Sequence, residues 1–282
     1  MAGQAGLGQD GPRAVLRDTG RVRRRKPTGS AEDMEKAREI SAYVCRGWCY
    51  AVLAIALALG AWLIVDPSLD LAASALFYRP GEGFAADHSP LLSAVRHVGN
   101  LLGKVFGAAI GVAVLFRIVT RRDALGIPMR ALVFLAAVQI AGPAVLVNAV
   151  LKEHWGRARP VQITEFGGTK HYTPPLIPAD QCAHNCSFVS GEASFGFSFL
   201  AFGFLPRTRR WRQAGFAFGA AFGSALGVMR IAQGGHFMSD IVFSAALMLL
   251  VAWVLERLIL DPRSIAWFDR ITQLGRRQSA DG

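Results

Sequence analysis

The sequence predicts an all-α polytopic membrane protein whose six transmembrane helices form a bundle. Of its 282 residues, 52% are hydrophobic and only 18% are charged, which is too apolar for a soluble domain of this size. Six apolar runs approach the roughly 20 residues that a helix needs to cross a bilayer. The Arg and Lys residues lie in short blocks between these runs, as topology signals do.

The expected helices occupy residues 47–65, 100–119, 129–150, 191–206, 213–230 and 237–259. The fourth and fifth are short and rich in Gly, Ala and Phe, as the stretch GFAFGAAFGSALG illustrates. Such sequences are typical of helices that pack closely against other helices rather than against lipid. The chain is therefore divided into a basic cytoplasmic tail (1–45), a membrane domain (46–260) and a C-terminal cytoplasmic tail (261–282).

The orientation follows from the basic residues. They concentrate in the N-terminal tail (RVRRRKP), in the loop after the second run and in the loop after the fourth run (RTRRWR). These segments are expected in the cytoplasm. With six crossings both termini lie inside, and residues 66–99, 151–190 and 230–236 form the outer loops. Because topology explains the net charge of +11, we expect no nucleic-acid partner.

Four cations lie on the outer side against this rule: Lys152, Arg157, Arg159 and Arg230. Charges near the membrane are costly and usually functional, so we expect an anion between them. Guanidinium and ammonium groups bind phosphate oxygens, and the start of the fourth helix at Ser190 and Gly191 adds backbone N–H donors and a positive dipole end. Arg157 is given only a supporting role, because it also fits an interface anchor.

His236 and Asp240 are four residues apart, which places them on one face near the outer end of the sixth helix. Asp240 can hold one ring nitrogen as N–H and leave the other free to attack phosphorus. A lone histidine at a helix end is more often structural. The partner Asp240 and the upstream Arg230 favour the catalytic interpretation.

The motifs K-x6-R-P, S-G and R-x5-H-x3-D, all on the outer side, resemble the three-part signature of the type 2 phosphatidic acid phosphatase (PAP2) superfamily. The resemblance covers about residues 47–259 and implies a membrane phosphatase that needs neither metal nor cofactor. It makes His236 the nucleophile of a phosphohistidine intermediate, oriented by Asp240. The residues that it assigns to phosphate binding are Lys152, Arg159, Ser190, Gly191 and Arg230.

The sequence departs from the family at SFVSGEASFGF. Val189 stands where the family usually has Pro, and Glu192 stands where it has the His that assists proton transfer to the leaving oxygen. Three interpretations stay open: Glu192 is the acid, Glu192 orients an Arg while another histidine such as His184 serves, or the protein is a weakened relative. A carboxylic acid can serve if its pKa is raised towards neutrality, and the intact remainder of the signature favours an active enzyme.

The stretch FVSGEAS with a nearby cysteine pair is similar to bacterial membrane phosphatases assigned to lipid A or related envelope lipids. This implies a bacterial inner membrane location, an active site that faces the periplasm and a lipid A-like substrate. Polyprenyl diphosphate, phosphatidic acid and phosphatidylglycerol phosphate are the alternatives. In another class, a non-catalytic protein that binds phospholipid headgroups fits the same cations. A channel is disfavoured because most helix centres are apolar, and the oligomeric state is not indicated.

Cys182 and Cys186 both fall in the large outer loop, in the stretch QCAHNCSF. An oxidising compartment permits a disulfide between them. Metal binding by this pair with His184 lacks a fourth ligand at the usual spacing, so no metal site is expected.

Overall fold

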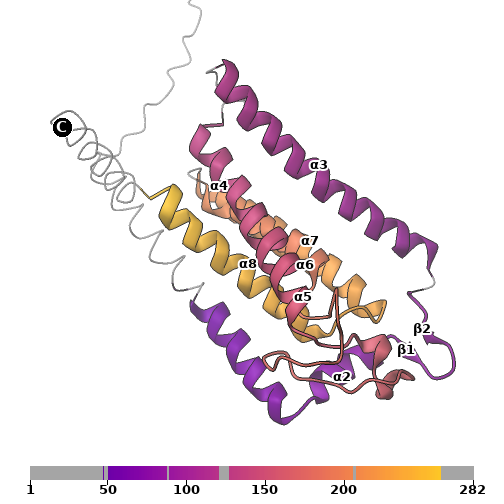
Figure 1. Ribbon diagram of the computed structural model, residues 1–282. Helices are drawn as coiled ribbons and strands as arrows, with labels where there is room; N and C mark the ends of the chain where they lie inside the picture. Colours follow the sequence, from indigo (N-terminus) through magenta and orange to yellow (C-terminus); the bar gives the residue numbers. More distant parts are fainter. Residues whose placement is uncertain (1–46, 48–49, 88, 121–126, 206–207, 262–282) are drawn as a thin grey trace, which may run out of the picture. The chain divides into compact units, whose positions relative to one another are not determined.

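The protein is described by a computed structural model that covers residues 47, 50–87, 89–120, 127–205 and 208–261. The two tails expected at 1–45 and 261–282 therefore lie almost wholly outside the described residues, and the domain boundaries stay predictions. Within the described part, regular structure is helical apart from a small hairpin of β1 (Tyr78–Arg79) and β2 (Gly83–Phe84) (Figure 1). The all-α class is confirmed for these residues.

Four helical segments of the described chain are long and apolar enough to cross a membrane: α3 (Pro90–Thr120), the run Met129–His154, α7 (Arg209–Ala232) and α8 (Met238–Ile259). The helix Tyr50–Val65 and α2 (Ser68–Ala75) meet at an angle of 92° and add a fifth candidate only if they are counted together. The expected total of six is not confirmed. The expected span 191–206 is instead a short helix, α6 (Gly191–Ser198), followed by the 3-10 helix η5 (Phe199–Phe204).

Part of the expected outer loop 66–99 is helical. It contains α2, and α3 begins at Pro90 rather than at residue 100. Proline suits the first turn of a helix because it has no N–H to leave unpaired. Ser89 precedes it and accepts a hydrogen bond from the Leu92 backbone N–H at 3.4 Å, as N-cap residues do. Ser89 and Pro90 are therefore a helix start signal in the sequence. The prediction missed it because it relied on the apolar run at residues 100–119.

The run Met129–His154 consists of α4 (Met129–Gln139), the π-helical segment η2 (Ile140–Leu151) and α5 (Lys152–His154). Pro143 lies inside it and has no N–H for the usual helical hydrogen bond. Asn148 Nδ2 donates to the Pro143 carbonyl at 2.6 Å, so a side chain pairs this carbonyl within the widened turns. Lys152, in the last turn of the run, lies beside the start of α6: a Cβ on Gly191 would be 3.5 Å from Lys152 Nζ.

Close helix packing places α6 and η5 against α7. Glycines recur every fourth residue along one face of α7, at Gly215, Gly219, Gly223 and Gly227. A Cβ on Gly219 would collide with the Leu200 backbone, and a Cβ on Gly223 with the Phe197 ring. Only glycine permits this approach, so the expectation that this region packs against helices rather than lipid is confirmed.

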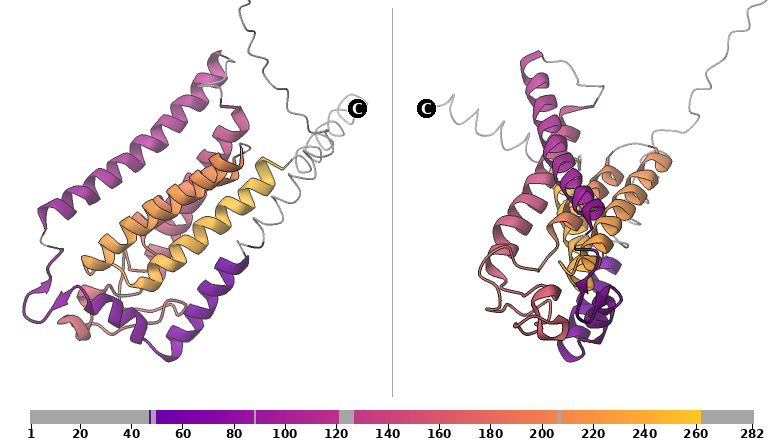
Figure 2. Two further views of the ribbon diagram at one scale, coloured as in Figure 1. Left: turned by 180° about the vertical axis from the view of Figure 1, so that it is seen from behind. Right: turned by 90° about the vertical axis from the view of Figure 1, so that its right-hand side faces the viewer.

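Two apolar clusters hold the described part together. The larger lies between α4, α6 and α8 and includes Phe134, Phe197 and Met248. The smaller, here called the loop cluster, consists of Phe84, Ala158, Ile163, Phe166 and Phe237. Figure 2 shows the chain between α5 and α6 gathered near α2 at one end of the helices. The loop cluster attaches this chain to the start of α8.

Candidate active site

His236 lies in the turn between α7 and α8, two residues before α8 begins at Met238. The prediction that His236 lies on the same helix as Asp240 is wrong, because α8 begins only after Phe237. Asp240 Oδ2 accepts a hydrogen bond from the Phe237 backbone N–H at 2.9 Å and so caps the start of α8. The same oxygen lies 3.5 Å from His236 Nδ1. Both side chains are fully buried, so the expected pairing is retained in a different local geometry.

Hydrogen bonds fix the Asp240 carboxylate in place. Arg157 Nη1 donates to Oδ1 at 2.5 Å, and Ser187 Oγ donates to Oδ2 at 2.5 Å. A carboxylate with donors on both oxygens is held ionised and in one orientation. Sequence reasoning gave Arg157 only a supporting role and did not single out Ser187, because neither belongs to a spacing pattern.

The other nitrogen of His236 faces Glu192. Glu192 Oε2 lies 3.7 Å from His236 Nε2, and Glu192 Oε1 lies 3.5 Å from Arg230 Nε. Neither nitrogen of His236 nor Arg230 Nε makes a hydrogen bond with any described residue. Lys152 is also buried and interacts electrostatically with Glu192. Buried nitrogen atoms without a hydrogen bond are rare, and the three found here each lie within 3.7 Å of a carboxylate oxygen of Glu192 or Asp240.

Arg159 and Ser190 are two further residues expected to bind phosphate. Arg159 Nη2 donates to the Asn185 carbonyl at 2.8 Å, and its charge acts on both Lys152 and Arg230. Ser190 is the N-cap of α6, and its hydroxyl accepts from the Ala193 N–H at 3.3 Å. The Ser190 hydroxyl therefore has a structural hydrogen bond in addition to the phosphate-binding role expected for it.

His184 lies elsewhere in the outer loop. Its Nδ1 is 2.9 Å from Glu153 Oε2, and its side chain is 82% exposed. The geometry thus favours Glu192 over His184 as the group that faces His236.

Cys182 and Cys186 form a disulfide in the same loop. Within the part of the chain that the structure describes, no three His, Cys, Asp or Glu side chains gather where they could hold a metal ion.

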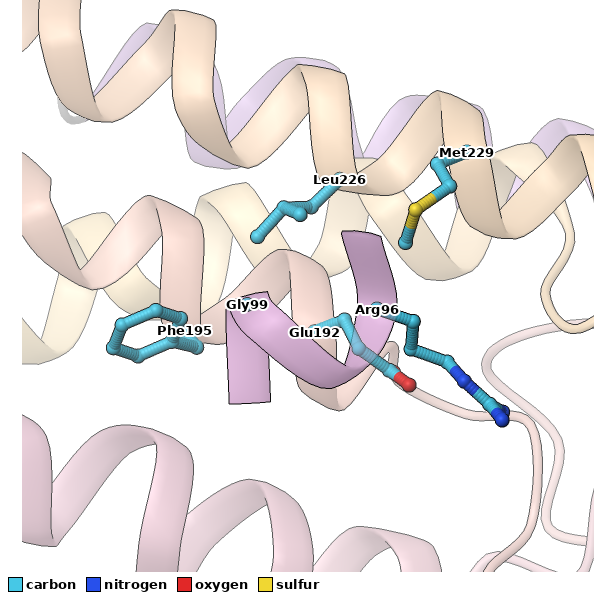
Figure 3. Close-up of a pocket in the computed structure, with 6 residues that line it drawn as sticks. All are labelled: Arg96, Gly99, Glu192, Phe195, Leu226 and Met229. Carbon is cyan, nitrogen blue, oxygen red and sulfur yellow. The ribbon is translucent and has the colours of Figure 1, made fainter. Parts of the chain in front are cut away.

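Beyond Glu192 the site borders a small, shallow cleft between α3, α6 and α7. In Figure 3 the Arg96 guanidinium and the Glu192 carboxylate lie near one end of this cleft and the Phe195 ring near the other. The remaining lining residues are Gly99, Leu226 and Met229. The polar end of the cleft thus lies at Arg96 and Glu192, and the rest of it is apolar.

Comparison with known proteins assigns the family. The sequence profile of the PAP2 superfamily matches residues 128–263. A lipid A 4'-phosphatase of Francisella tularensis subsp. novicida (strain U112) is 33% identical over 214 residues, which are 74% of this chain and 96% of that protein. The chain belongs to the PAP2 superfamily. Two lipid A 4'-phosphatases from Rhizobium leguminosarum and Rhizobium etli (strain ATCC 51251 / DSM 11541 / JCM 21823 / NBRC 15573 / CFN 42) give shorter matches.

The Rhizobium leguminosarum protein is 46% identical over 104 residues, which are 36% of this chain and 44% of that protein. The Rhizobium etli protein is 44% identical over 103 residues, which are 36% of this chain and 39% of that protein. No solved structure matches the chain. In this PAP2 protein the family profile covers all candidate site residues from Lys152 to Asp240, whereas α2 and α3 precede the matched residues in the chain.

Proposed function

We propose that this PAP2 protein is a lipid A 4'-phosphatase, which hydrolyses the phosphate ester at the 4' position of lipid A. The names of its three relatives support this substrate. One observation carries the chemistry: His236 is held between two carboxylates, with Asp240 at Nδ1 and Glu192 at Nε2, beside buried cations. This arrangement suits nucleophilic attack by Nε2 on an anionic phosphate.

Phosphate binding is the first step. A phosphate dianion is neutralised by Lys152, Arg159 and Arg230, of which the two arginines offer planar paired donors. In the free protein Arg230 is paired with Glu192. The substrate therefore replaces an internal carboxylate as the partner of Arg230.

Covalent transfer follows. The Nε2 lone pair of His236 attacks phosphorus while the phosphorus–oxygen bond to the sugar breaks, and the oxygen leaves with the bonding electron pair. Asp240 holds the Nδ1 proton and stabilises the positive ring. Water then attacks phosphorus in the phosphohistidine, inorganic phosphate leaves, and the imidazole is restored.

Glu192 is proposed as the acid that protonates the leaving sugar oxygen. Its carboxylate is ionised beside Arg230 in the free protein. A bound phosphate becomes the partner of Arg230 instead and brings further negative charge close to Glu192. Both changes favour protonation of the carboxyl group. The proton can then pass to the leaving oxygen, and the resulting carboxylate can activate the hydrolytic water.

The reaction is proposed to take place at the periplasmic face of a bacterial inner membrane, with six spans and both termini in the cytoplasm. The ends of the helices support this orientation. Met129–His154 begins beside Arg130 and has Lys152 in its last turn, and α7 begins at Arg209 and ends near His236. The basic ends are those remote from the candidate site, as the positive-inside rule requires.

The test is release of inorganic phosphate from a panel of lipids by the purified protein in detergent. The panel contains lipid A with a 4'-phosphate, polyprenyl diphosphate, phosphatidic acid and phosphatidylglycerol phosphate. We expect lipid A to be the best substrate and the His236→Ala variant to be inactive. Radiolabelled lipid should leave acid-labile phosphate on the wild-type protein. Saturable binding without release or a covalent adduct would instead establish a headgroup-binding protein.

A further inference from the structure

Asp70 is a buried carboxylate that the mechanism above does not use. It lies in the first turn of α2 and is fully buried. Its Oδ1 accepts from the Ser239 backbone N–H at 2.8 Å, and its Oδ2 accepts from the Ser239 hydroxyl at 2.6 Å. The Tyr172 hydroxyl donates to Oδ2 at 3.0 Å. Burial and the neighbouring Asp70 raise the pKa of Tyr172, which keeps this phenol a donor.

Arg157 joins Asp70 to the catalytic pair. Its Nη2 donates to Asp70 Oδ2 at 2.8 Å, and its Nη1 donates to Asp240 Oδ1 at 2.5 Å. Its Nε donates to the Thr173 carbonyl at 2.8 Å, and its guanidinium lies 4.4 Å from the centre of the Phe237 ring. Burial alone would lower the pKa of Arg157, but Asp240 and Asp70 raise it. The side chain is fully buried and stays cationic.

The charges in this group do not cancel. One guanidinium lies between two carboxylates, so the group carries a net charge of about −1 when all three are ionised. A buried surplus charge is costly unless a partner of opposite sign is present. The nearest group that can become positive is the His236 ring, whose Nδ1 lies 3.5 Å from Asp240 Oδ2. Without the Asp70 charge, Arg157 and Asp240 would form a neutral pair.

We propose that Asp70 is a positioning residue that balances the charge of Arg157 and so leaves the negative charge of Asp240 available to His236. The ring becomes positive when Nε2 bonds to phosphorus, and the surplus negative charge stabilises that state. This role rests on the proposed function, because it assumes the phosphohistidine step. The other charges near His236 come from α5, α6 and α7: Lys152, Glu192 and Arg230. A change at Asp70 alters none of them directly.

The first test is Asp70→Asn, which removes the charge and retains the size. We expect kcat to fall about tenfold to a hundredfold with KM within about twofold. We also expect the acid side of the kcat–pH profile to move to lower pH, because the positive ring loses a nearby negative charge. Asp66→Asn, before the same helix, is the matched control and should behave as wild type. An unshifted profile in Asp70→Asn would overturn the proposal.

Variants that separate charge from hydrogen bonding complete the test. Tyr172→Phe and Ser239→Ala each remove a hydrogen bond to Asp70 but keep both carboxylates, so we expect an unshifted profile. Asp70→Glu keeps the charge in an altered position and should likewise keep the profile while kcat falls. If Asp70→Asn does not fold, Asp70→Glu decides: a shifted profile in that variant contradicts the charge role.

A measurement without substrate distinguishes this inference from the proposed function. The His236 ring is titrated by NMR in the substrate-free wild-type protein and in Asp70→Asn, with His236→Ala to assign the signal. We expect the midpoint to move to lower pH in Asp70→Asn. If no lipid releases phosphate but the midpoint moves, the proposed function is wrong and the charge balance stands. If phosphate is released and the midpoint does not move, the charge role is wrong.

Discussion

At the residue scale, the feature that sets this site apart is a carboxylate on each side of one imidazole. Asp240 lies at Nδ1 and is held by Arg157 and Ser187. Glu192 lies at Nε2 and is held by Arg230. Glu192 is thus, in the free protein, the anionic partner of the Arg230 guanidinium that binds phosphate in the proposed reaction. An internal anion lowers the cost of burying Lys152 and Arg230 without substrate.

Removal of the Glu192 acid tests its role in proton transfer. In Glu192→Gln we expect kcat for phosphate release to fall by about a hundredfold or more, because the leaving oxygen loses its proton donor. The alkaline side of the kcat–pH profile should flatten, since the group whose deprotonation limits the rate is absent. Phosphate release as a function of pH is the measurement.

The control for Glu192 is Glu153→Gln, which removes an acid that is paired with His184 in the outer loop. It should change kcat by less than about threefold, because surface pairs contribute little. Wild-type activity in Glu192→Gln would remove this carboxyl from the mechanism.

At the scale of elements, the site depends on how closely α6 approaches α7. The first turn of α6 supplies Glu192, and the last turn of α7 supplies Arg230. Contact between these helices runs through glycines on both: a Cβ on Gly196 would lie 2.6 Å from the Gly223 Cα. The stacked Phe218 and Phe222 rings flank the same contact. A backbone-to-backbone contact of this kind fixes the separation of the two charged ends.

Widening this contact should destabilise the protein. In Gly219→Ala the new methyl group collides with the Leu200 backbone, so we expect a loss of about 1–3 kcal/mol from overpacking. Thermal unfolding in detergent, followed by circular dichroism, measures the change. Gly107→Ala in α3 is the matched control, since nothing lies within 4 Å of its Cβ; its stability should stay within about 1 kcal/mol of wild type. Equal stability of the two variants would contradict a close-packed α6–α7 contact.

At the scale of the whole molecule, the candidate site is assembled from segments far apart in the chain. Asp70 comes from α2, Arg157 and Ser187 from the chain between α5 and α6, and His236 from the turn before α8. The loop cluster and the buried Arg157 connect these segments at one end of the helices. Basic residues such as Arg130 lie at the other end of their helices. This polarity agrees with the proposed periplasmic site.

Labelling from one side of the membrane tests this orientation. Thr169→Cys lies in the exposed chain near the site, and Arg130→Cys lies exposed at the far end of Met129–His154. In a background with Cys45→Ser and Cys49→Ser, an impermeant maleimide added to spheroplasts should label Thr169→Cys alone. Arg130→Cys should react only after the membrane is opened. The reverse pattern would place the candidate site in the cytoplasm.

The sequence could predict those parts of the site that depend on spacing along one short segment. Apolar runs predicted the all-α class, since a bilayer requires helices with all backbone groups paired. The motif residues from Lys152 to Asp240 were found because local spacing and charge type carry the signal. The structure does not confirm the six-helix count: at residues 191–206 it has α6 and η5 within a glycine-rich contact with α7 rather than one long helix.

What the sequence by itself determined is which residue types make up the candidate site: the cations, the histidine, its aspartate and the unusual Glu192. Only the tertiary structure decided which other residues hydrogen-bond to these groups and fix their positions. Asp70, for example, accepts hydrogen bonds from Arg157 and Ser239, which are more than 80 residues away in the chain. Such contacts follow from the packing of α2 and the outer chain onto α8, and no periodicity encodes them. The surplus charge beside His236 is therefore visible only when the segments are brought together.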